Sequence, residues 1–234
     1  MARRGNDAFT LIPMAREGWR FVIPTLGLML ICMVLEWWGA AAFFLVLMLA
    51  CGAFFRDPHR PVPIRPGLIL SPADGKVISV AEVEIETVGG KRERLRRVGV
   101  FLSIFDVHIQ RAPAFGTILS VRHTPGKFLN ALNDKASEEN ENNLIWMETT
   151  MGTVGVRQIA GIIARRVVCK CRPRQHVLAG ERIGLIRFGS RTEAYFPLQA
   201  RVLTRVGRKV QAGLSILAEM PVVRNPEATR ESSE

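Results

Sequence analysis

The sequence predicts a mainly β protein, with a sandwich-like or barrel-like β domain preceded by an apolar helical hairpin. Short β-type runs recur along residues 61–223; in Val77–Val88, for example, Val83 and Ile85 alternate with glutamates. Turn residues separate these runs at intervals of about 8–12 residues, and no long amphipathic helix lies between them. The third observation is a dense apolar block, Phe21–Phe55, which lies ahead of all the β runs.

The apolar block predicts two short helices. Its only charged side chain is Glu36, beside Trp37 and Trp38 at the middle. Each half holds about 15 apolar residues, or about 22 Å of helix, which is short of a hydrocarbon core about 30 Å thick. Arginines flank both ends, so both ends are expected in the cytoplasm. We therefore expect a shallow or re-entrant hairpin at the cytoplasmic face of the cell membrane. A single tilted span and a buried soluble hairpin remain the alternatives.

The chain divides at a proline-rich segment. Three prolines within Pro61–Pro66 exclude a helix there. We expect a membrane-associating segment at 1–60, a β-rich domain at 61–223, and a disordered tail at 224–234. The polar run Ser137–Asn143 predicts a mobile loop, which could act as a lid.

Charge and composition narrow the range of partners. Lys+Arg 32 against Asp+Glu 21 gives a net charge of +11, which favours an anionic partner. A single tyrosine, and tryptophans that lie outside the basic stretches, argue for an anionic membrane surface and against nucleic acid. The pair Cys169 and Cys171 has no second Cys/His pair to complete a zinc site, so no metal is expected.

Three stretches place reactive side chains beside β runs. Asp74 lies in a turn before a strand, His108 follows a buried strand, and Ser190 follows Gly189 between two strands. A histidine that takes a hydroxyl proton and a carboxylate that orients the histidine are the parts that activate a serine. Glycine has no Cβ to obstruct attack on its carbonyl, so Ser190 could attack Gly189. The alternatives without catalysis are an Asx turn at Asp74, a structural role for His108 and an ordinary β turn at Gly189-Ser190.

Four blocks carry a family resemblance. Ser71-Pro-Ala-Asp-Gly-Lys76, Phe101-Leu-Ser-Ile-Phe-Asp-Val-His108, the block that begins Gln158-Ile-Ala-Gly161, and Gly184-Leu-Ile-Arg-Phe-Gly-Ser190 occur in this order. They resemble the signature blocks of phosphatidylserine decarboxylase in its compact bacterial form. The resemblance extends over residues 55–200, most of the chain.

The resemblance implies a proenzyme that cuts itself. Ser190 would attack the Gly189 carbonyl, and elimination would leave a pyruvoyl group in place of Ser190, with Asp74 and His108 assisting. The products would be a β chain, 1–189, and an α chain, 190–234, with further dimerisation left open. The pyruvoyl cofactor would form a Schiff base with phosphatidylserine, release CO2 and yield phosphatidylethanolamine. The hairpin and the basic surface would hold this phospholipid substrate at an anionic membrane.

The sequence departs from the family at one position. Longer members carry two histidines three apart, and the second position here is Arg111, which stays protonated and cannot act as a base. Either His108 serves both self-cleavage and decarboxylation, or another group takes one step. The group that binds the lipid phosphate is open.

A non-enzymatic interpretation remains as an alternative. The Gly180–Gly184 stretch resembles lipoyl- or biotinyl-type β-sandwich carriers, and the β domain could share that lipoyl-like or hybrid-motif-like fold. The chain would then be a membrane adaptor. That alternative lacks a modified-lysine motif and leaves Gly189-Ser190 without a purpose.

Overall fold

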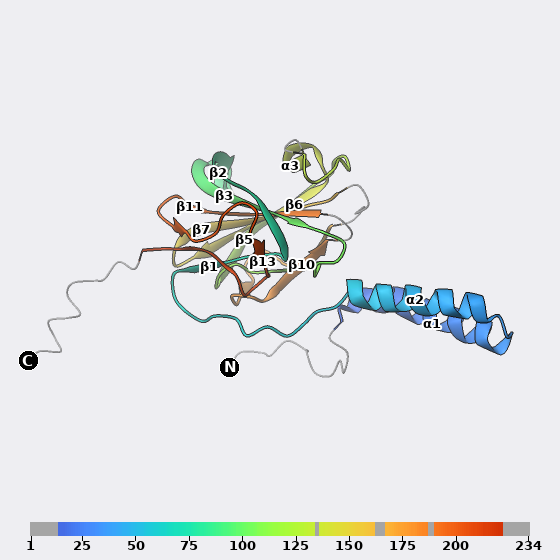
Figure 1. Cartoon of the computed structure of the whole chain (residues 1–234). Coiled ribbons are helices and arrows are strands. Elements are labelled where there is room, and N and C mark those ends of the chain that lie inside the picture. Colours follow the sequence, from blue (N-terminus) through green and yellow to red (C-terminus); the bar gives the residue numbers. More distant parts are fainter. Residues whose placement is uncertain (1–13, 134–135, 162–166, 187–189, 222–234) are drawn as a thin grey trace, which may run out of the picture.

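The computed structural model describes residues 14–133, 136–161, 167–186 and 190–221. Helices α1 (Trp19–Val34) and α2 (Trp38–Phe54) form a hairpin that projects from a β domain, and η1 (Arg16–Gly18) precedes them (Figure 1). The shorter helical segments η2 (Val88–Gly90) and α3 (Ala136–Glu139) lie within the β domain. The strands are β1 (Leu68–Leu70), β2 (Gly75–Glu86), β3 (Arg92–Leu102), β4 (Ile109–Arg111), β5 (Gly116–Thr124), β6 (Asn142–Thr149), β7 (Gly152–Ile159), β8 (Val167–Cys169), β9 (His176–Val177), β10 (Arg182–Ile186), β11 (Ser190–Pro197), β12 (Arg201–Val202), β13 (Lys209–Val210) and β14 (Ile216–Glu219).

The strands form three antiparallel sheets. The largest has the order β13-β2-β3-β11-β7-β6-β5-β9, and two smaller sheets have the orders β1-β14-β12 and β4-β10-β8. The main apolar core contains residues of all three sheets, among them Val100, Ala218 and Ile183. The mainly β fold with an N-terminal apolar helix pair is therefore confirmed.

Strand β11 lies inside the largest sheet, between β3 and β7. Ser190, its first residue, pairs with Leu102, and Arg191 pairs with Ile159. Alternate residues of β11, such as Ala194 and Phe196, enter the main core. This position places Ser190 at the end of a strand that is held from both sides.

The turn of the hairpin lies at Glu36, as the sequence predicts. Glu36 lies between the helices with φ +59°, and Trp37 and Trp38 beside it are 63% and 65% exposed. The helical segment Arg16–Val34 is long and apolar enough to cross a membrane, and little of it is buried. At 1.5 Å per residue, each helix of the hairpin extends for about 25 Å. The hairpin thus presents an apolar surface that the β domain does not cover.

The foot of the hairpin packs on the β domain. Phe54 and Phe55 form an apolar cluster with Val107, Ile109 and Leu185, which lie around β4 and β10. Beyond it, Asp57 accepts a hydrogen bond from Arg111 Nη2 at 2.7 Å, across 54 residues of sequence. The hairpin is therefore joined to the small β4-β10-β8 sheet by both apolar and ionic contacts.

The expectation of a mobile loop at Ser137–Asn143 is wrong. Ala136–Glu139 form α3, and β6 begins at Asn142. Asn140 is fully buried, and its Nδ2 donates to the carbonyl oxygens of Leu129 and Ala160, each at 2.8 Å. Polar side chains that satisfy one another inside the protein give the same sequence pattern as a solvated loop. The predicted disordered tail at 224–234 lies outside the described residues, and the division into three segments stays a prediction.

Candidate active site

Ser190 begins β11 in a buried position. Its side chain has no exposed surface, and its Oγ has no hydrogen-bond partner among the described residues. A buried hydroxyl without a partner is uncommon and costs free energy, about 1–3 kcal/mol. Gly189 lies outside the described residues. Ser190 therefore fits a hydroxyl that is held ready for chemistry better than one that serves packing.

His108 is buried with one ring nitrogen bound and the other without a partner. Nδ1 donates to the carbonyl oxygen of Asp106 at 2.8 Å. Because a carbonyl only accepts, Nδ1 carries the proton of the neutral ring, and Nε2 keeps a lone pair. Nε2 is buried and has no partner among the described residues. The ring is therefore arranged as a proton acceptor.

Burial keeps His108 neutral. It lowers the pKa of His108 from 6.5 to about 4, against smaller opposing effects from Asp106 and Asp74. One side of the ring is covered by Phe54, whose ring centroid lies 4.1 Å away. A neutral imidazole at physiological pH can accept a proton from a hydroxyl.

The fold brings Ser190 and His108 to the same end of the sheets. Ser190 pairs with Leu102, and the segment that follows Leu102 leads in six residues to His108. Ile186 N donates to the His108 carbonyl oxygen at 3.3 Å. Ile186 precedes Ser190 by four residues, which can span at most about 14 Å. These two predicted site residues therefore lie at the same end of the sheets, and Ser190 Oγ and His108 Nε2 are not hydrogen-bonded to each other.

Asp74 is placed beside β3 but is bound to other partners. Arg60 donates to both of its carboxylate oxygens, at 2.6 and 2.8 Å, and Ala212 N donates at 2.8 Å. The next residue, Gly75, has φ +139°, and a Cβ there would collide with the Phe101 carbonyl. Asp74 is therefore held by Arg60, and its charge has the smallest of the effects on the pKa of His108. The carbonyl of Asp106 is the group that binds Nδ1 of the imidazole.

Arg111, at the position of the family's second histidine, belongs to the joint with the hairpin. Its Nη2 donates to Asp57 Oδ1, and its Nη1 donates to the Gly180 carbonyl at 2.9 Å. Burial lowers the pKa of Arg111, and the charge of Asp57 opposes that effect. Its hydrogen bonds give it a structural role.

A chain of hydrogen bonds between buried side-chain amides ends at the backbone carbonyl of His108. Asn143 Nδ2 donates to Gln158 Oε1 at 3.0 Å, and Gln158 Nε2 donates to Gln110 Oε1 at 3.0 Å. Gln110 Nε2 then donates to the His108 carbonyl at 3.1 Å. Gln158 and Gln110 are fully buried. Gln158 begins one of the four family blocks, and its buried amide links β6, β7 and β4.

A second buried polar cluster fixes the outer face of β11. Glu193 accepts hydrogen bonds from Ser137 Oγ at 2.9 Å and from Tyr195, and it forms an ion pair with Arg191 at 2.7 Å. Burial and the charge of Glu193 raise the pKa of Tyr195. These contacts fix the strand that carries Ser190, and the sequence pattern did not reveal them.

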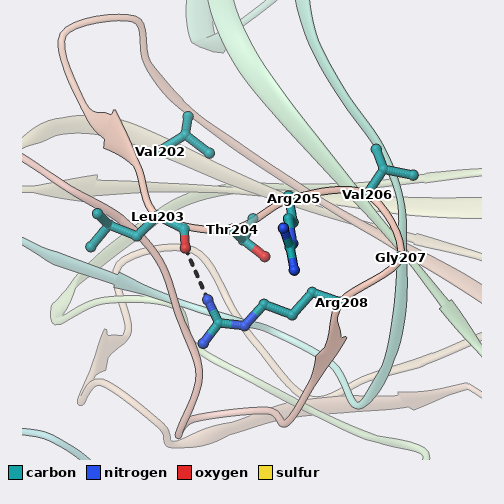
Figure 2. Close-up of a pocket in the computed structure, with 7 residues that line it drawn as sticks. All are labelled: Val202, Leu203, Thr204, Arg205, Val206, Gly207 and Arg208. Carbon is teal, nitrogen blue, oxygen red and sulfur yellow. Dashed lines mark hydrogen bonds between the residues drawn. The ribbon is translucent and has the colours of Figure 1, made fainter.

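A hollow of about 830 Å³ lies elsewhere, along residues Val202–Arg208. Figure 2 shows Arg208 reaching across the loop to the Leu203 carbonyl, to which its Nη1 donates at 2.9 Å. None of its lining residues is a predicted site residue. Within the described ranges, no three His, Cys, Asp or Glu side chains are grouped to hold a metal ion.

The fold and the site define a class of protein: a mainly β protein with an apolar helix pair, in which a buried serine and a neutral histidine lie at the same end of the sheets. The family model described as phosphatidylserine decarboxylase matches residues 47–218. The chain belongs to the phosphatidylserine decarboxylase family, and the resemblance found in its sequence blocks is confirmed. Members are lyases that decarboxylate phosphatidylserine, a phospholipid, to phosphatidylethanolamine; the family is membrane-associated and pyruvoyl-dependent.

Proposed function

We propose that this protein is a self-cleaving phosphatidylserine decarboxylase whose pyruvoyl group derives from Ser190. The observation that carries the proposal is the buried Ser190 Oγ, which has no partner among the described residues. The free Nε2 of a neutral His108 lies at the same end of the sheets and supports it. Both atoms suit proton transfer from the hydroxyl to the imidazole.

Self-cleavage would proceed by an acyl shift. His108 Nε2 takes the Ser190 hydroxyl proton while Oγ bonds to the Gly189 carbonyl carbon. The peptide C–N bond then breaks as the imidazolium returns this proton to the Ser190 nitrogen, which leaves an ester and a free amine. Removal of the Ser190 Cα proton and breakage of the Cβ–Oγ bond release Gly189 as a carboxylate and leave dehydroalanine. Water hydrolyses its imine tautomer to the ketone, and ammonia leaves. The chain thereby becomes a β chain, 1–189, and an α chain, 190–234.

Asp74 contributes through its charge. Its carboxylate raises the pKa of His108 by Coulomb attraction, which stabilises the imidazolium that forms when Nε2 takes a proton. The Arg60 pair holds the carboxylate in place, because it binds both oxygens in a fork. Asp74 is therefore a positioning and electrostatic residue in this proposal.

In decarboxylation the pyruvoyl group supplies an electron sink for the electrons that CO2 leaves behind. The protein's part is to bind and enclose the head group and to deliver the one proton that replaces the carboxylate. His108 Nε2, which carries no proton at rest, is suited to relay a proton from water to the carbon that loses the carboxylate. The same group serves both steps, since the hydrogen bonds of Arg111 assign it to the joint with Asp57.

The apolar hairpin would place this site at the cytoplasmic face of the membrane. The phospholipid substrate keeps its acyl chains in the bilayer, so the site must meet the head group at the surface. A net charge of +11 favours an anionic membrane. We propose a membrane segment at 1–60, a catalytic domain at 61–223 and a tail at 224–234, with dimerisation of the cleaved protein left open.

Intact-mass measurement of the purified protein tests the proposal. We expect two chains divided between Gly189 and Ser190, the smaller one blocked to Edman degradation by its pyruvoyl end. Ser190→Ala should remain a single inactive chain, whereas Ser120→Ala, which changes a half-buried serine of β5, should be cleaved normally. Decarboxylation by an uncleaved chain, or by Ser190→Ala, would falsify the cofactor assignment.

A further inference from the structure

The turn that links β3 to His108 displays apolar side chains to solvent. Ile104 is 49% exposed and Phe105 is 79% exposed. The turn itself is well bonded: Asp106 N donates to the Ser103 carbonyl at 3.0 Å, and Ser103 N donates to Asp106 Oδ2 at 2.8 Å. A turn with this internal bonding holds both side chains outward, where water is a poor solvent for them.

This turn is fastened to the foot of the hairpin. Arg56, which follows α2, donates from Nη2 to the Phe105 carbonyl at 2.5 Å and from Nη1 to the Ala53 carbonyl at 2.6 Å. One guanidinium group thus joins the last turn of α2 to the displayed turn. The helices leave the β domain from this foot (Figure 1). The displayed turn therefore lies beside the foot of the hairpin.

We propose that Ile104 and Phe105 form a second membrane contact, inserted at the interface of the phospholipid bilayer beside the hairpin. The proposal rests on the membrane placement of the hairpin given above. An aromatic and a branched aliphatic side chain beside an arginine suit the boundary between head groups and acyl chains. The exposed tip, its connection to the hairpin and its apolar chemistry all favour a lipid surface as the occupant.

The contact would set the height of the active site above the bilayer. The residue that ends the turn, Asp106, provides the carbonyl that binds His108 Nδ1. Only Val107 lies between Asp106 and His108, so insertion of the tip fixes the imidazole near the level of the head groups. A phosphatidylserine head group could then reach the site while its acyl chains stay in the bilayer.

Tryptophan quenching in the full-length protein tests the insertion directly. Phe105→Trp is bound to phosphatidylcholine and phosphatidylglycerol vesicles whose acyl chains carry bromine, and the wild-type spectrum is subtracted. We expect the added tryptophan to be quenched by half or more. Val88→Trp is the control, because Val88 begins η2, which connects β2 to β3, and it should not be quenched. The labelled β2 and β3 lie on the side of the β domain away from α1 and α2 (Figure 1).

An unquenched signal from the tryptophan that Phe105→Trp adds overturns the proposal whatever the hairpin does. The wild-type spectrum contains the exposed Trp37 and Trp38 of the hairpin besides Trp19 and the buried Trp146, so an unquenched wild-type spectrum would count against the membrane placement itself. A second measurement compares substrates. Phe105→Ser should raise the KM for phosphatidylserine in vesicles about tenfold, from the burial that a phenyl ring loses. It should leave turnover of a dispersed short-chain phosphatidylserine and cleavage at Gly189 unchanged; an equal loss on both substrates would contradict the proposal.

Discussion

The ring of Phe54, the last residue of α2, lies 4.1 Å from the imidazole of His108. The hairpin therefore contributes to the candidate active site, because Phe54 covers the proposed base and excludes water from one side of its ring. The depressed pKa of His108 arises mainly from burial, to which this contact contributes. Attachment of the hairpin and the basicity of His108 are physically linked.

Removing the Phe54 ring should raise the pKa of His108. In the uncleaved Ser190→Ala background, Phe54→Ala lets water reach the imidazole, so the pKa should move from about 4 toward 6.5. NMR titration of the His108 ring measures the shift. Phe43→Ala, on the exposed side of the hairpin, is the matched control and should leave the pKa as it is. An unchanged pKa in Phe54→Ala would show that the ring does not shield the base.

Stability should fall as the solution becomes acidic because of His108. Its pKa is about 4 when folded and 6.5 ordinarily, so between these values the unfolded chain binds more protons. The free energy of unfolding should therefore decrease as pH falls from 6.5 to 4, by up to about 3 kcal/mol from this residue. Denaturant titrations of Ser190→Ala with and without His108→Gln measure the difference. Equal pH slopes for both proteins would rule out a neutral buried His108.

The chain of buried amides should contribute both to the stability of the fold and to the rate of self-cleavage. Gln158→Leu leaves Gln110 Oε1 and Asn143 Nδ2 without their partners, at a cost of about 1–3 kcal/mol for each group. Thermal unfolding should detect the loss, and self-cleavage should slow because the His108 backbone loses its support. Gln199→Leu, at an exposed position, should change neither. Normal cleavage and stability in Gln158→Leu would refute a supporting role.

A histidine placed at position 111 should not raise the rate of decarboxylation. Arg111→His removes a guanidinium group from buried Asp57 and should destabilise the protein by up to about 3 kcal/mol. The exposed pair of Arg94 and Glu82 provides the comparison, since Arg94→His should cost less than about 1 kcal/mol. Unfolding midpoints and decarboxylation rates are the measurements. A faster, equally stable Arg111→His enzyme would assign the position to catalysis.

The two chains should stay together after cleavage. Strand β11, which belongs to the α chain, pairs with β3 over eight residues and with β7 over five. Separation would break both ladders and expose Ala194 and Phe196 of the main core. Gel filtration in mild detergent should therefore give one species, and only denaturing electrophoresis should resolve two. Dissociation without denaturant would contradict this arrangement.

The sequence was informative where a pattern is local. The single charge at Glu36 divided an apolar run, which predicted the hairpin and its turn. Alternation in Val77–Val88 predicts strand β2, and the polar stretches and motif blocks point to Asp74, His108 and Ser190. Contacts that depend on the fold were not accessible: any residue could offer the carbonyl that Asp106 provides, and the pair of Asp57 and Arg111 joins positions 54 apart. Asn140 was misjudged because a buried amide and a solvated one look the same in sequence.

The central place of β11 would also determine how the proposed two-chain enzyme is replaced in the cell. A strand inserted between two others folds together with them. Each α chain would therefore not exchange, and would stay with the β chain with which it was synthesised. The two chains would occur in a one-to-one ratio, because both come from one precursor. A molecule whose pyruvoyl end has been damaged could not be repaired by taking up another α chain. Each catalytic centre would be made once, by one translation event, and lost as a whole.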